Sequence, residues 1–243
     1  MEIMKYNFDD FKQKLGQFNI SITASMEEQF SDFYDLLIEW NQVMNLTAIT
    51  EFHEVVEKHF LDSVSLAHFV QWKEGDSLID IGTGAGFPGI PIKILFPELR
   101  IVLADSLNKR VRFLEEVISK LNLSGISAIH ARAEDLARKK EHRAQYDICV
   151  SRAVANLSSL SEYCIPFIKT GGKFISYKTC GIGEEVENAK KSMHLMGGEL
   201  KDVIEFQLPG TEYMRSFVII EKVEATPKKY PRKAGIPSKE PIC

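Results

Sequence analysis

The chain has 243 residues, a formal net charge of -4, and 44% hydrophobic and 26% charged residues, the composition of one globular domain with at most a small appendage. No apolar run approaches the roughly 20 residues of a membrane span, and the N-terminus carries acids where a signal peptide would be apolar, which favours a cytoplasmic protein. The four cysteines lie far apart with no CxxC pair, which predicts free thiols and no zinc site.

Residues 1–72 are predicted to form a helical cap. Between residues 25 and 44, apolar side chains recur at spacings of three and four, which is typical of an amphipathic helix: Phe30, Phe33, Leu37, Trp40 and Met44. Ser25 and Glu28 have the spacing of a capping box at the start of this helix. A second helix is expected over about residues 51–70, and no strand pattern interrupts the region.

From residue 77 the pattern alternates between strands and helices. Strands are predicted at residues 77–81, 100–105, 126–131, 146–153 and 172–178, and the clearest helices between them at 89–96 and 108–123. Such alternation requires crossover connections and therefore predicts a parallel sheet. Residues 203–223 differ, because two strand-like runs flank Pro209 and Gly210. They predict a hairpin whose last strand runs antiparallel to the rest.

The stretch "LIDIGTGAGFPG", residues 78–89, holds two overlapping glycine patterns. Counted from Gly84 it reads GxGxxG, the dinucleotide fingerprint. Counted from Asp80 it reads DxGxG (Asp80, Gly82, Gly84), which is similar to the first motif of Rossmann-like S-adenosylmethionine methyltransferases. A tight turn without a ligand is a third interpretation. Because the strand runs directly into Gly82, Gly84 comes late for a dinucleotide. The Asp80 carboxylate would also attract the cationic methionine end of the methyl donor and repel a pyrophosphate.

Two further strand ends carry candidate ligand contacts. Asp105 ends the second strand, where an acid can accept hydrogen bonds from both ribose hydroxyls in either class of enzyme. Ala133 and Glu134 follow the third strand, at the position that contacts adenine in such methyltransferases. The alternative for Glu134 is an acid that stabilises a helix N-terminus.

The loop after the fourth strand reads "SRAVANL" and lacks the [DNS]PP[YFW] motif of adenine and cytosine amino-methyltransferases. Neither Cys149 nor Cys164 is placed as the nucleophile of a cytosine carbon-5 enzyme. Ring nitrogen 7 of guanine has a free lone pair, so its methylation can proceed by proximity and orientation without a general base. The missing motifs therefore favour nitrogen 7 as the target.

Several stretches, in this order, resemble the bacterial small-subunit (16S) ribosomal RNA guanine-N7 methyltransferases, also called glucose-inhibited division protein B. They are "EWNQVMNLTAIT", "KHFLDSVS", "DIGTGAGFPGIPIKI", "ADSLNKRVRFLE", "RAEDL", "SRAVANL", "YK" and "KKYPRKAGIPSKEPI". The resemblance covers nearly the whole chain from about residue 30. Relatives often have an arginine where this chain has Asn156, which puts an RNA contact at that position in doubt.

The resemblance implies a Rossmann-like class I methyltransferase: an α/β, doubly wound, mostly parallel sheet at residues 73–223, behind the helical cap. It implies S-adenosylmethionine as donor and S-adenosylhomocysteine as product. The implied donor site comprises Gly82, Phe87, Asp105, Ala133, Glu134 and Arg152, to which the DxGxG pattern adds Asp80 and Gly84.

On the acceptor side, Arg152 and Lys178 are expected to position the substrate, with no general base and no metal ion. The alternative for Lys178 is a solvated lysine. Lys109 and Arg110 begin a helix, where positive charge is unfavourable unless a polyanion binds there. His59 and Asp62, one helical turn apart, either face the donor pocket or pin the cap to the sheet.

The C-terminal tail, residues 224–243, contains four prolines and is expected to be extended. Its candidate RNA contacts are Lys228, Lys229, Tyr230, Arg232, Lys233 and Lys239, with the tyrosine stacking on a base. Deletion of residues 226–243 is expected to weaken RNA binding and spare donor binding. The alternative is a solubilising tail.

The expected partner is small-subunit ribosomal RNA or the small ribosomal subunit, with neither DNA nor a membrane. Two other functions stay open at this point. One is a Rossmann NAD(P)-dependent oxidoreductase that uses the GxGxxG pattern. The other is a non-catalytic RNA- or ribosome-binding module with a decayed donor pocket.

Overall fold

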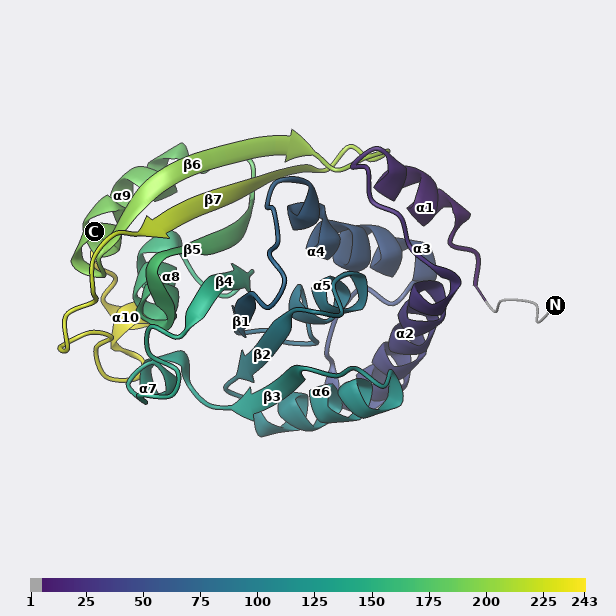
Figure 1. Cartoon of the computed structure of the whole chain (residues 1–243), viewed down its shortest axis with the longest axis horizontal. Helices are drawn as coiled ribbons and strands as arrows, with labels where there is room; N and C mark the ends of the chain where they lie inside the picture. The colour runs from purple at the N-terminus through teal and green to yellow at the C-terminus, as the bar shows by residue number, and fades with distance from the viewer. Residues whose placement is uncertain (1–5) are drawn as a thin grey trace.

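The computed structural model describes residues 6–243, and a seven-stranded mixed sheet runs through the molecule in the order β3-β2-β1-β4-β5-β7-β6 (Figure 1). The strands are β1 (Ser77–Ile81), β2 (Arg100–Asp105), β3 (Ile126–His130), β4 (Tyr146–Arg152), β5 (Ile168–Thr179), β6 (Gly198–Gln207) and β7 (Met214–Lys222). The first five are parallel, and β7 is antiparallel to both β5 and β6. The predicted parallel sheet and the antiparallel last strand are confirmed.

The strand order places β1 between β2 and β4, so the crossovers that leave β1 and β3 turn in opposite directions. Ligands of doubly wound sheets bind at this switch point, outside the carboxyl ends of the strands. Here those ends bring together Gly82, Asp105 and Arg152, which lie far apart in the sequence.

Helices cover both faces of the sheet. One face carries α5 (Gly89–Leu95) and α6 (Asn108–Lys120), and the other carries α7 (Ala133–Leu136), α8 (Leu157–Cys164), the 3-10 turn η3 (Ile165–Phe167) and α9 (Gly183–Leu195). Successive strand residues point to opposite faces. Leu78 of β1 accordingly packs in the first hydrophobic cluster and Ile79 in the second.

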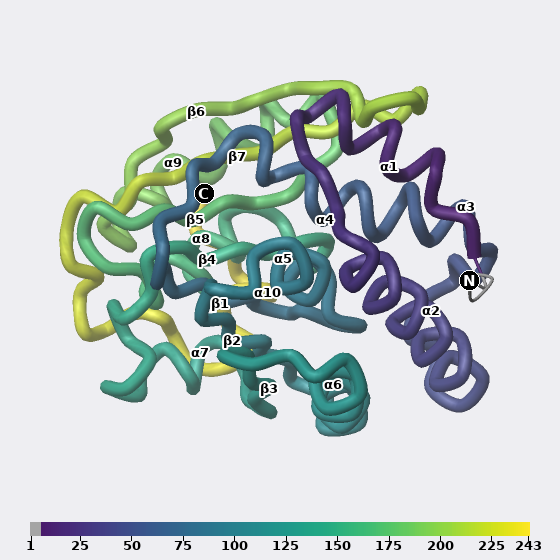
Figure 2. The backbone as a smooth tube through the Cα atoms, turned by 45° about the vertical axis from the view of Figure 1, so that its right-hand side comes forward, coloured from purple at the N-terminus to yellow at the C-terminus, as the bar shows by residue number. Residues whose placement is uncertain are grey.

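The N-terminal helices gather at one end of the molecule and extend the first cluster (Figure 2). They are α1 (Asp9–Gly16), α2 (Ala24–Met44) and α3 (Phe52–Val55), followed without a break by the π-helix η1 (Val56–Leu61), α4 (Asp62–Val64) and the 3-10 turn η2 (Ser65–His68). The ring of Phe33 lies 5.6 Å from that of Phe60 and 5.3 Å from that of Phe87. The cap is therefore packed directly on the glycine-rich loop.

Two sequence predictions about local structure were wrong. Helix α2 begins one residue before Ser25, and its cap is Thr23, whose extended backbone lets Oγ1 accept from the Met26 N–H at 3.3 Å. Ser25 and Glu28 thus lie inside the helix and form no capping box. The C-terminal tail is also not extended throughout, because residues Ile236–Lys239 form the single helical turn α10.

No helix within residues 6–243 combines the length and the apolarity that a membrane crossing requires.

The packing of the glycine-rich loop predicts that adding a methyl group at Gly86 destabilises the protein. Gly86 has φ +89°, and a Cβ there would lie 2.4 Å from Ile90 Cδ1. The left-handed backbone costs about 1–2 kcal/mol and overpacking about 1–3 kcal/mol, so Gly86→Ala should lower the free energy of unfolding by at least about 2 kcal/mol in urea titrations. Gly181→Ala is the matched control, with φ +77° and open space around the new Cβ. Equal losses in both variants would show that the packing around Gly86 is not the constraint.

Candidate functional site

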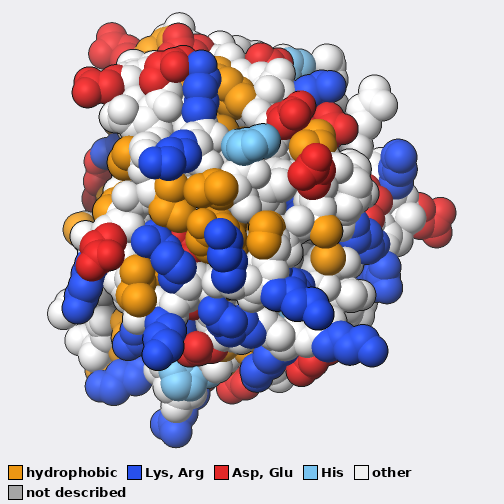
Figure 3. Space-filling view, turned by 90° about the vertical axis from the view of Figure 1, so that its left-hand side faces the viewer, with side chains coloured by type: hydrophobic (Ala, Val, Ile, Leu, Met, Phe, Trp, Pro, Cys, Tyr) orange, Lys and Arg blue, Asp and Glu red, His pale blue; other side chains and the backbone are white. Residues whose placement is uncertain are grey.

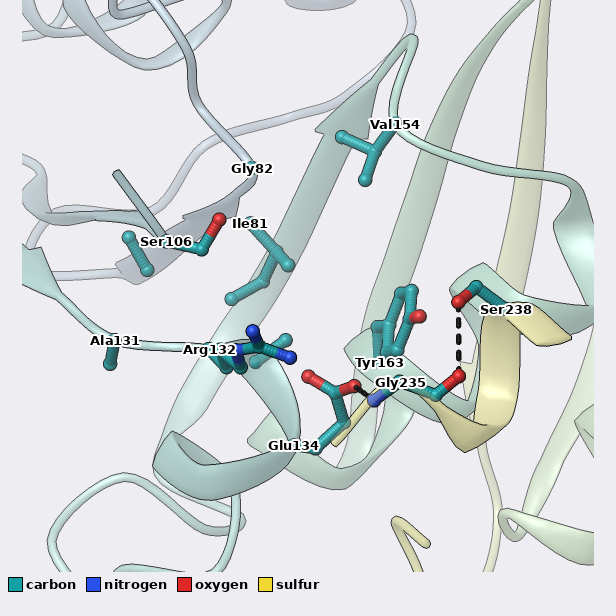
Figure 4. A pocket seen from close by; sticks show the side chains of 12 residues that line it. Ile81, Gly82, Ser106, Ala131, Arg132, Glu134, Val154, Tyr163, Gly235 and Ser238 are labelled. Carbon is teal, nitrogen blue, oxygen red and sulfur yellow. Dashed lines mark hydrogen bonds between the residues drawn. The ribbon is translucent and has the colours of Figure 1, made fainter. Parts of the chain in front are cut away.

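A cavity of about 330 Å³ lies at the carboxyl ends of β1 to β4 (Figure 4). Its walls are Ile81, Gly82, Ala104, Ser106, Ala131, Arg132, Ala133, Glu134, Val154, Tyr163, Gly235 and Ser238. Small and apolar side chains form most of the surface, and the hydroxyls of Ser106 and Ser238 and the carboxylate of Glu134 stand at separate points. Such a site suits a flat, partly polar ligand of cofactor size.

The loop before α5 is fixed by a buried carboxylate. Asp80 Oδ2 accepts from the Thr83 hydroxyl at 2.7 Å and from the Gly89 N–H at 2.9 Å. Oδ1 is buried and has no partner among the described residues. Burial, only partly offset by these two bonds, raises the pKa of Asp80 to about 7.

Asp105 fastens two loops together. Its Oδ2 accepts from the Gly84 N–H at 3.0 Å and its Oδ1 from the Leu107 N–H at 2.8 Å, and Arg110 lies 3.5 Å away. The side chain that reaches the cavity from this strand end is that of the next residue, Ser106 (Figure 4).

Of the predicted donor contacts, Gly82, Ala133 and Glu134 line the cavity. Five others do not line it: Asp80, Gly84, Phe87 and Asp105 belong to the loops around it, and Arg152 lines a second cavity, described below. Among the lining residues that were not predicted from the sequence are Ser106, Tyr163, Gly235 and Ser238. Ser106 could have been found as the neighbour of a strand-end acid, but the other three depend on tertiary contacts that no local pattern signals.

Gly82 closes one side of the cavity against the β4–α8 loop, residues 153–156. At φ +71°, a Cβ on Gly82 would lie 2.4 Å from Cγ2 of Val154, so only glycine fits beneath this side chain. Val154 itself is 41% exposed and stands at the rim of the opening (Figure 4).

The C-terminal segment 226–243, called the strap below, folds over the same cavity. Arg143 donates to the carbonyls of Thr226, Pro227 and Tyr230, and Arg138 donates to that of Pro231. These bonds hold the backbone of the strap against the body of the protein.

Further along the strap, the fully buried Glu162 accepts from the backbone N–H, Nε and Nη2 of Arg232. The Gly235 N–H then donates to Glu134 Oε1 at 2.7 Å (Figure 4). Glu134 therefore uses one carboxylate oxygen to hold the strap at the cavity wall.

This placement corrects three expectations about the tail. Tyr230 is 8% exposed and packs in the second hydrophobic cluster, so its ring is not available to stack on a base. Arg232 pairs with Glu162 and is not a free cation. Because Gly235 and Ser238 line the cavity, removal of residues 226–243 would also damage the site that the tail was expected to spare.

The outer side of the strap stays basic. Lys228, Lys229, Lys233 and Lys239 are exposed, as are Arg138, Lys139 and Lys140 on the segment after α7. Figure 3, which faces this end of the molecule, shows Lys and Arg side chains spread around an apolar patch.

A second cavity of about 390 Å³ lies on the other side of the β4–α8 loop. It is lined by Lys58, His59, Asp62, Arg152, Ala153, Tyr177, Lys178, Thr179 and Arg215. Ala153, at φ +58°, faces this cavity, whereas the next residue, Val154, faces the first. Two consecutive residues thus separate the cavities. Nowhere in residues 6–243 do three or more His, Cys, Asp or Glu side chains group as metal ligands.

Asp62 joins the cap to two strands of the sheet. Its Oδ2 accepts from Arg152 Nη1 and its Oδ1 from Arg215 Nε, each at 2.7 Å. Arg152 Nη1 also donates to the Lys58 carbonyl at 3.2 Å. Lys58 and His59 belong to the π-helix η1, a conformation often found at functional sites. The His59–Asp62 motif therefore both pins the cap and lines a cavity.

His59 lies between the glycine loop and Arg152. Its ring stacks on Phe87 at 4.6 Å, its Nε2 is 2.9 Å from Thr47 Oγ1, and its Nδ1 is 3.3 Å from Arg152 Nη2. Burial, followed by the positive charge of Arg152, lowers the pKa of His59 to about 4. The imidazole is therefore neutral at pH 7.

Lys178 of β5 and Asn156 at the start of α8 hold the β4–α8 loop. Lys178 donates to the Ala155 carbonyl at 3.0 Å and to Glu185 at 2.7 Å, so it supports the loop besides lining the second cavity. Asn156 Oδ1 accepts from the Ser159 N–H at 2.9 Å and caps α8. Asn156, at the position where the sequence resemblance led us to expect an arginine, thus has a structural role here.

Residues 26–214 match the family model described as rRNA small subunit methyltransferase G. Two similar proteins carry the name ribosomal RNA small subunit methyltransferase G. That of Lachnoclostridium phytofermentans is 53% identical over 232 residues, covering 96% of both chains. That of Bacillus mycoides is 48% identical over 236 residues, covering 97% of this chain and 99% of the relative.

Solved structures agree on the fold. TYW2 of M. jannaschii, in complex with AdoMet, superposes with a TM-score of 0.55 at 17% identity, over 72% of this chain and 80% of that one. A SAM-dependent methyltransferase of Aquifex aeolicus superposes with a TM-score of 0.50 at 16% sequence identity, over 69% of this chain and 93% of that one. The Rossmann-like methyltransferase fold expected from the sequence is therefore confirmed.

The partly buried His59 predicts a specific pH dependence of stability. An unfolded histidine protonates near pH 6.5 and the folded one only near 4, so the unfolding free energy should fall by about 3 kcal/mol as the pH drops through this interval. His59→Gln should remove this component of the slope in urea titrations between pH 7 and 4. The raised pKa of Asp80 stabilises the fold as the pH drops, which is the opposite effect. It acts equally in the wild type and in His59→Gln and therefore cancels when their slopes are compared.

His53→Gln is the control, because His53 is exposed on the same helical segment, and it should keep the wild-type slope. An unchanged slope in His59→Gln would contradict the assignment of a neutral imidazole to the folded state.

Proposed function

The chain belongs to the rRNA small subunit methyltransferase G family, and on this premise we propose that it transfers a methyl group from S-adenosylmethionine to ring nitrogen 7 of a guanosine in small-subunit (16S) ribosomal RNA. The observation that carries the proposal is the pair of cavities on either side of the β4–α8 loop. We place the reaction in the cytoplasm, on the small subunit or its RNA. Family membership leaves no support for an oxidoreductase or a non-catalytic module.

The first cavity fits the donor. Its apolar floor of Ile81, Ala104 and Ala131 suits a purine, and the hydroxyl of Ser106 and the carboxylate of Glu134 offer polar contacts at its edge. Gly82, without a Cβ, lets the ligand approach the end of β1. S-adenosylmethionine, when bound, supplies a methyl group on a positively charged sulfur. Asp80 and Asp105 act by holding the loops that surround it.

The second cavity takes the acceptor guanine in this proposal. The titratable groups that line it are poor general bases: His59 has a pKa of about 4, and both oxygens of Asp62 bind arginines. Nitrogen 7 of guanine needs none, since its lone pair attacks the methyl carbon and no proton leaves. Arg152, beside the β4–α8 loop, orients the base in this proposal.

The outer side of the strap holds RNA in this proposal. Its four exposed lysines are Lys228, Lys229, Lys233 and Lys239. Four phosphate contacts to single-stranded RNA would give a log–log salt slope of about -2.8.

Transfer of labelled methyl tests the reaction and its target atom together. With small ribosomal subunits that lack native modification, the label should appear in 7-methylguanosine. Asp105→Ala leaves the N–H groups of Gly84 and Leu107 without an acceptor, at about 1–3 kcal/mol each. It should lower kcat/KM by about ten- to a hundredfold. Label in another nucleoside would refute nitrogen 7 of guanine while keeping the donor.

The structure of the strap predicts that substitutions at the adjacent residues Arg232 and Lys233 have different effects on donor binding. Arg232→Gln leaves the buried Glu162 unpaired and loosens the wall that carries Gly235. Its Kd for S-adenosylhomocysteine should rise by about tenfold, or ~1.4 kcal/mol, in calorimetric titrations. Lys233→Gln removes the same charge from an exposed position and should leave the Kd unchanged. Equal Kd values for the two variants would mean that the strap is not part of the donor site.

A further inference from the structure

The side chains that line the second cavity carry more positive than negative charge. Asp62 is the one carboxylate among its described lining residues, and it binds Arg152 and Arg215 at once. One carboxylate offsets one guanidinium, so one unit of positive charge remains at this pair. The two lysines differ, because Lys58 pairs with Glu54 and Lys178 with Glu185.

Arg215 is the freer of the two arginines. Its side chain is 21% exposed, against 13% for Arg152, which also contacts Lys58 and His59. Arg215 donates Nε to Asp62 and Nη1 to the Met214 carbonyl. Within residues 6–243, no hydrogen bond engages its Nη2. The uncompensated charge and a free donor therefore coincide on β7.

Tyr213 brings a second cation beside this donor. Its ring centroid lies 5.6 Å from Lys58 Nζ and 5.5 Å from the guanidinium carbon of Arg215. A ring that faces two cations stabilises both at short range. Lys58 from η1 and Arg215 from β7 thus lie around one aromatic ring and line the same cavity.

We propose that Lys58 and Arg215 bind a phosphate group of the nucleotide that is methylated. The inference rests on the proposed function, because it takes the second cavity as the acceptor site. A phosphodiester carries one negative charge, which is the charge that the cavity lacks, and its oxygens match the planar fork of a guanidinium. Every nucleotide has the same phosphate, so this contact positions the guanosine and leaves its recognition to other groups.

Asp62 is a positioning residue in this arrangement. Its bond to Nε fixes the plane of the Arg215 guanidinium and leaves the Nη2 donor for the phosphate. The same carboxylate holds Arg152 beside the β4–α8 loop. One side chain from the cap therefore sets the distance between the phosphate contact and Arg152, which orients the base in the proposed function.

Two probes that differ by a phosphate test the proposal. Guanosine and 5′-GMP are titrated into the full-length protein saturated with S-adenosylhomocysteine. The wild-type protein should bind 5′-GMP about tenfold or more tightly than guanosine, and Arg215→Gln should abolish this preference. Lys201→Gln, which removes an exposed cation from β6, should retain it. Equal wild-type affinities, binding of neither probe, or a preference that survives in Arg215→Gln overturns the proposal.

Asp62→Asn separates positioning from charge. Charge alone predicts tighter 5′-GMP binding, because the cavity becomes more positive. Positioning predicts a smaller preference for 5′-GMP over guanosine, because Arg215 is no longer held. An equal or larger preference overturns the role of Asp62.

Asp62→Asn can also unfold the chain, because it leaves two partly buried guanidiniums without their carboxylate. Arg215→Lys is the second test, since it keeps the charge and loses the fork. It should reduce the preference at least about threefold, and full retention counts against the proposal.

Methyl transfer to small subunits, measured on the same preparations, distinguishes failure of the phosphate inference from failure of the proposed function. A wild-type protein that forms 7-methylguanosine without preferring 5′-GMP refutes this inference alone. A wild-type protein that transfers no methyl refutes the proposed function with it.

Discussion

The Asp80 carboxylate accepts from the Thr83 hydroxyl and from the Gly89 N–H, and so ties the end of β1 to the start of α5 across a loop of glycines. Asp105 accepts from the Gly84 N–H within that loop and from the Leu107 N–H that leads to α6. The two acids thus fix the ends of β1 and β2 relative to each other. The first cavity exists because both loops are held back from the strand ends.

Because Asp80 must hold the loop from inside the protein, its carboxylate is buried at a cost in free energy. Only one of its oxygens is hydrogen-bonded by described residues, while the other is buried without a partner, so burial raises its pKa to about 7. A carboxamide of the same shape could accept both bonds only with its oxygen toward Thr83 and Gly89, and its NH2 group would then occupy the buried position that has no partner. The acid is retained for the geometry of the loop, and direct contact with a ligand is left to Gly82 and Ser106.

Local patterns predicted most of the fold and part of the site. The 2- and 3.6-residue periodicities gave the strands and helices, and the glycine spacing located the end of β1. They could not find Tyr163, Gly235 or Ser238, because these reach the first cavity from α8 and from the strap, outside the strand ends that the patterns mark. Glu162, which holds the strap, could not be found from the sequence either, because it looks like an ordinary helix residue until its burial is known.

The basic tail shows why charge patterns mislead about single residues. A run of lysines and arginines between prolines predicts a solvated segment, yet Arg232 is bound by Glu162 and Tyr230 is packed in a core. The strap consequently has two sides: Gly235 and Ser238 face the first cavity, and the lysines face outward. In the proposed function, RNA and the donor therefore contact opposite sides of one segment. Whatever effect one of these ligands has on the affinity for the other through the strap is reciprocal, because thermodynamic linkage makes the two factors equal.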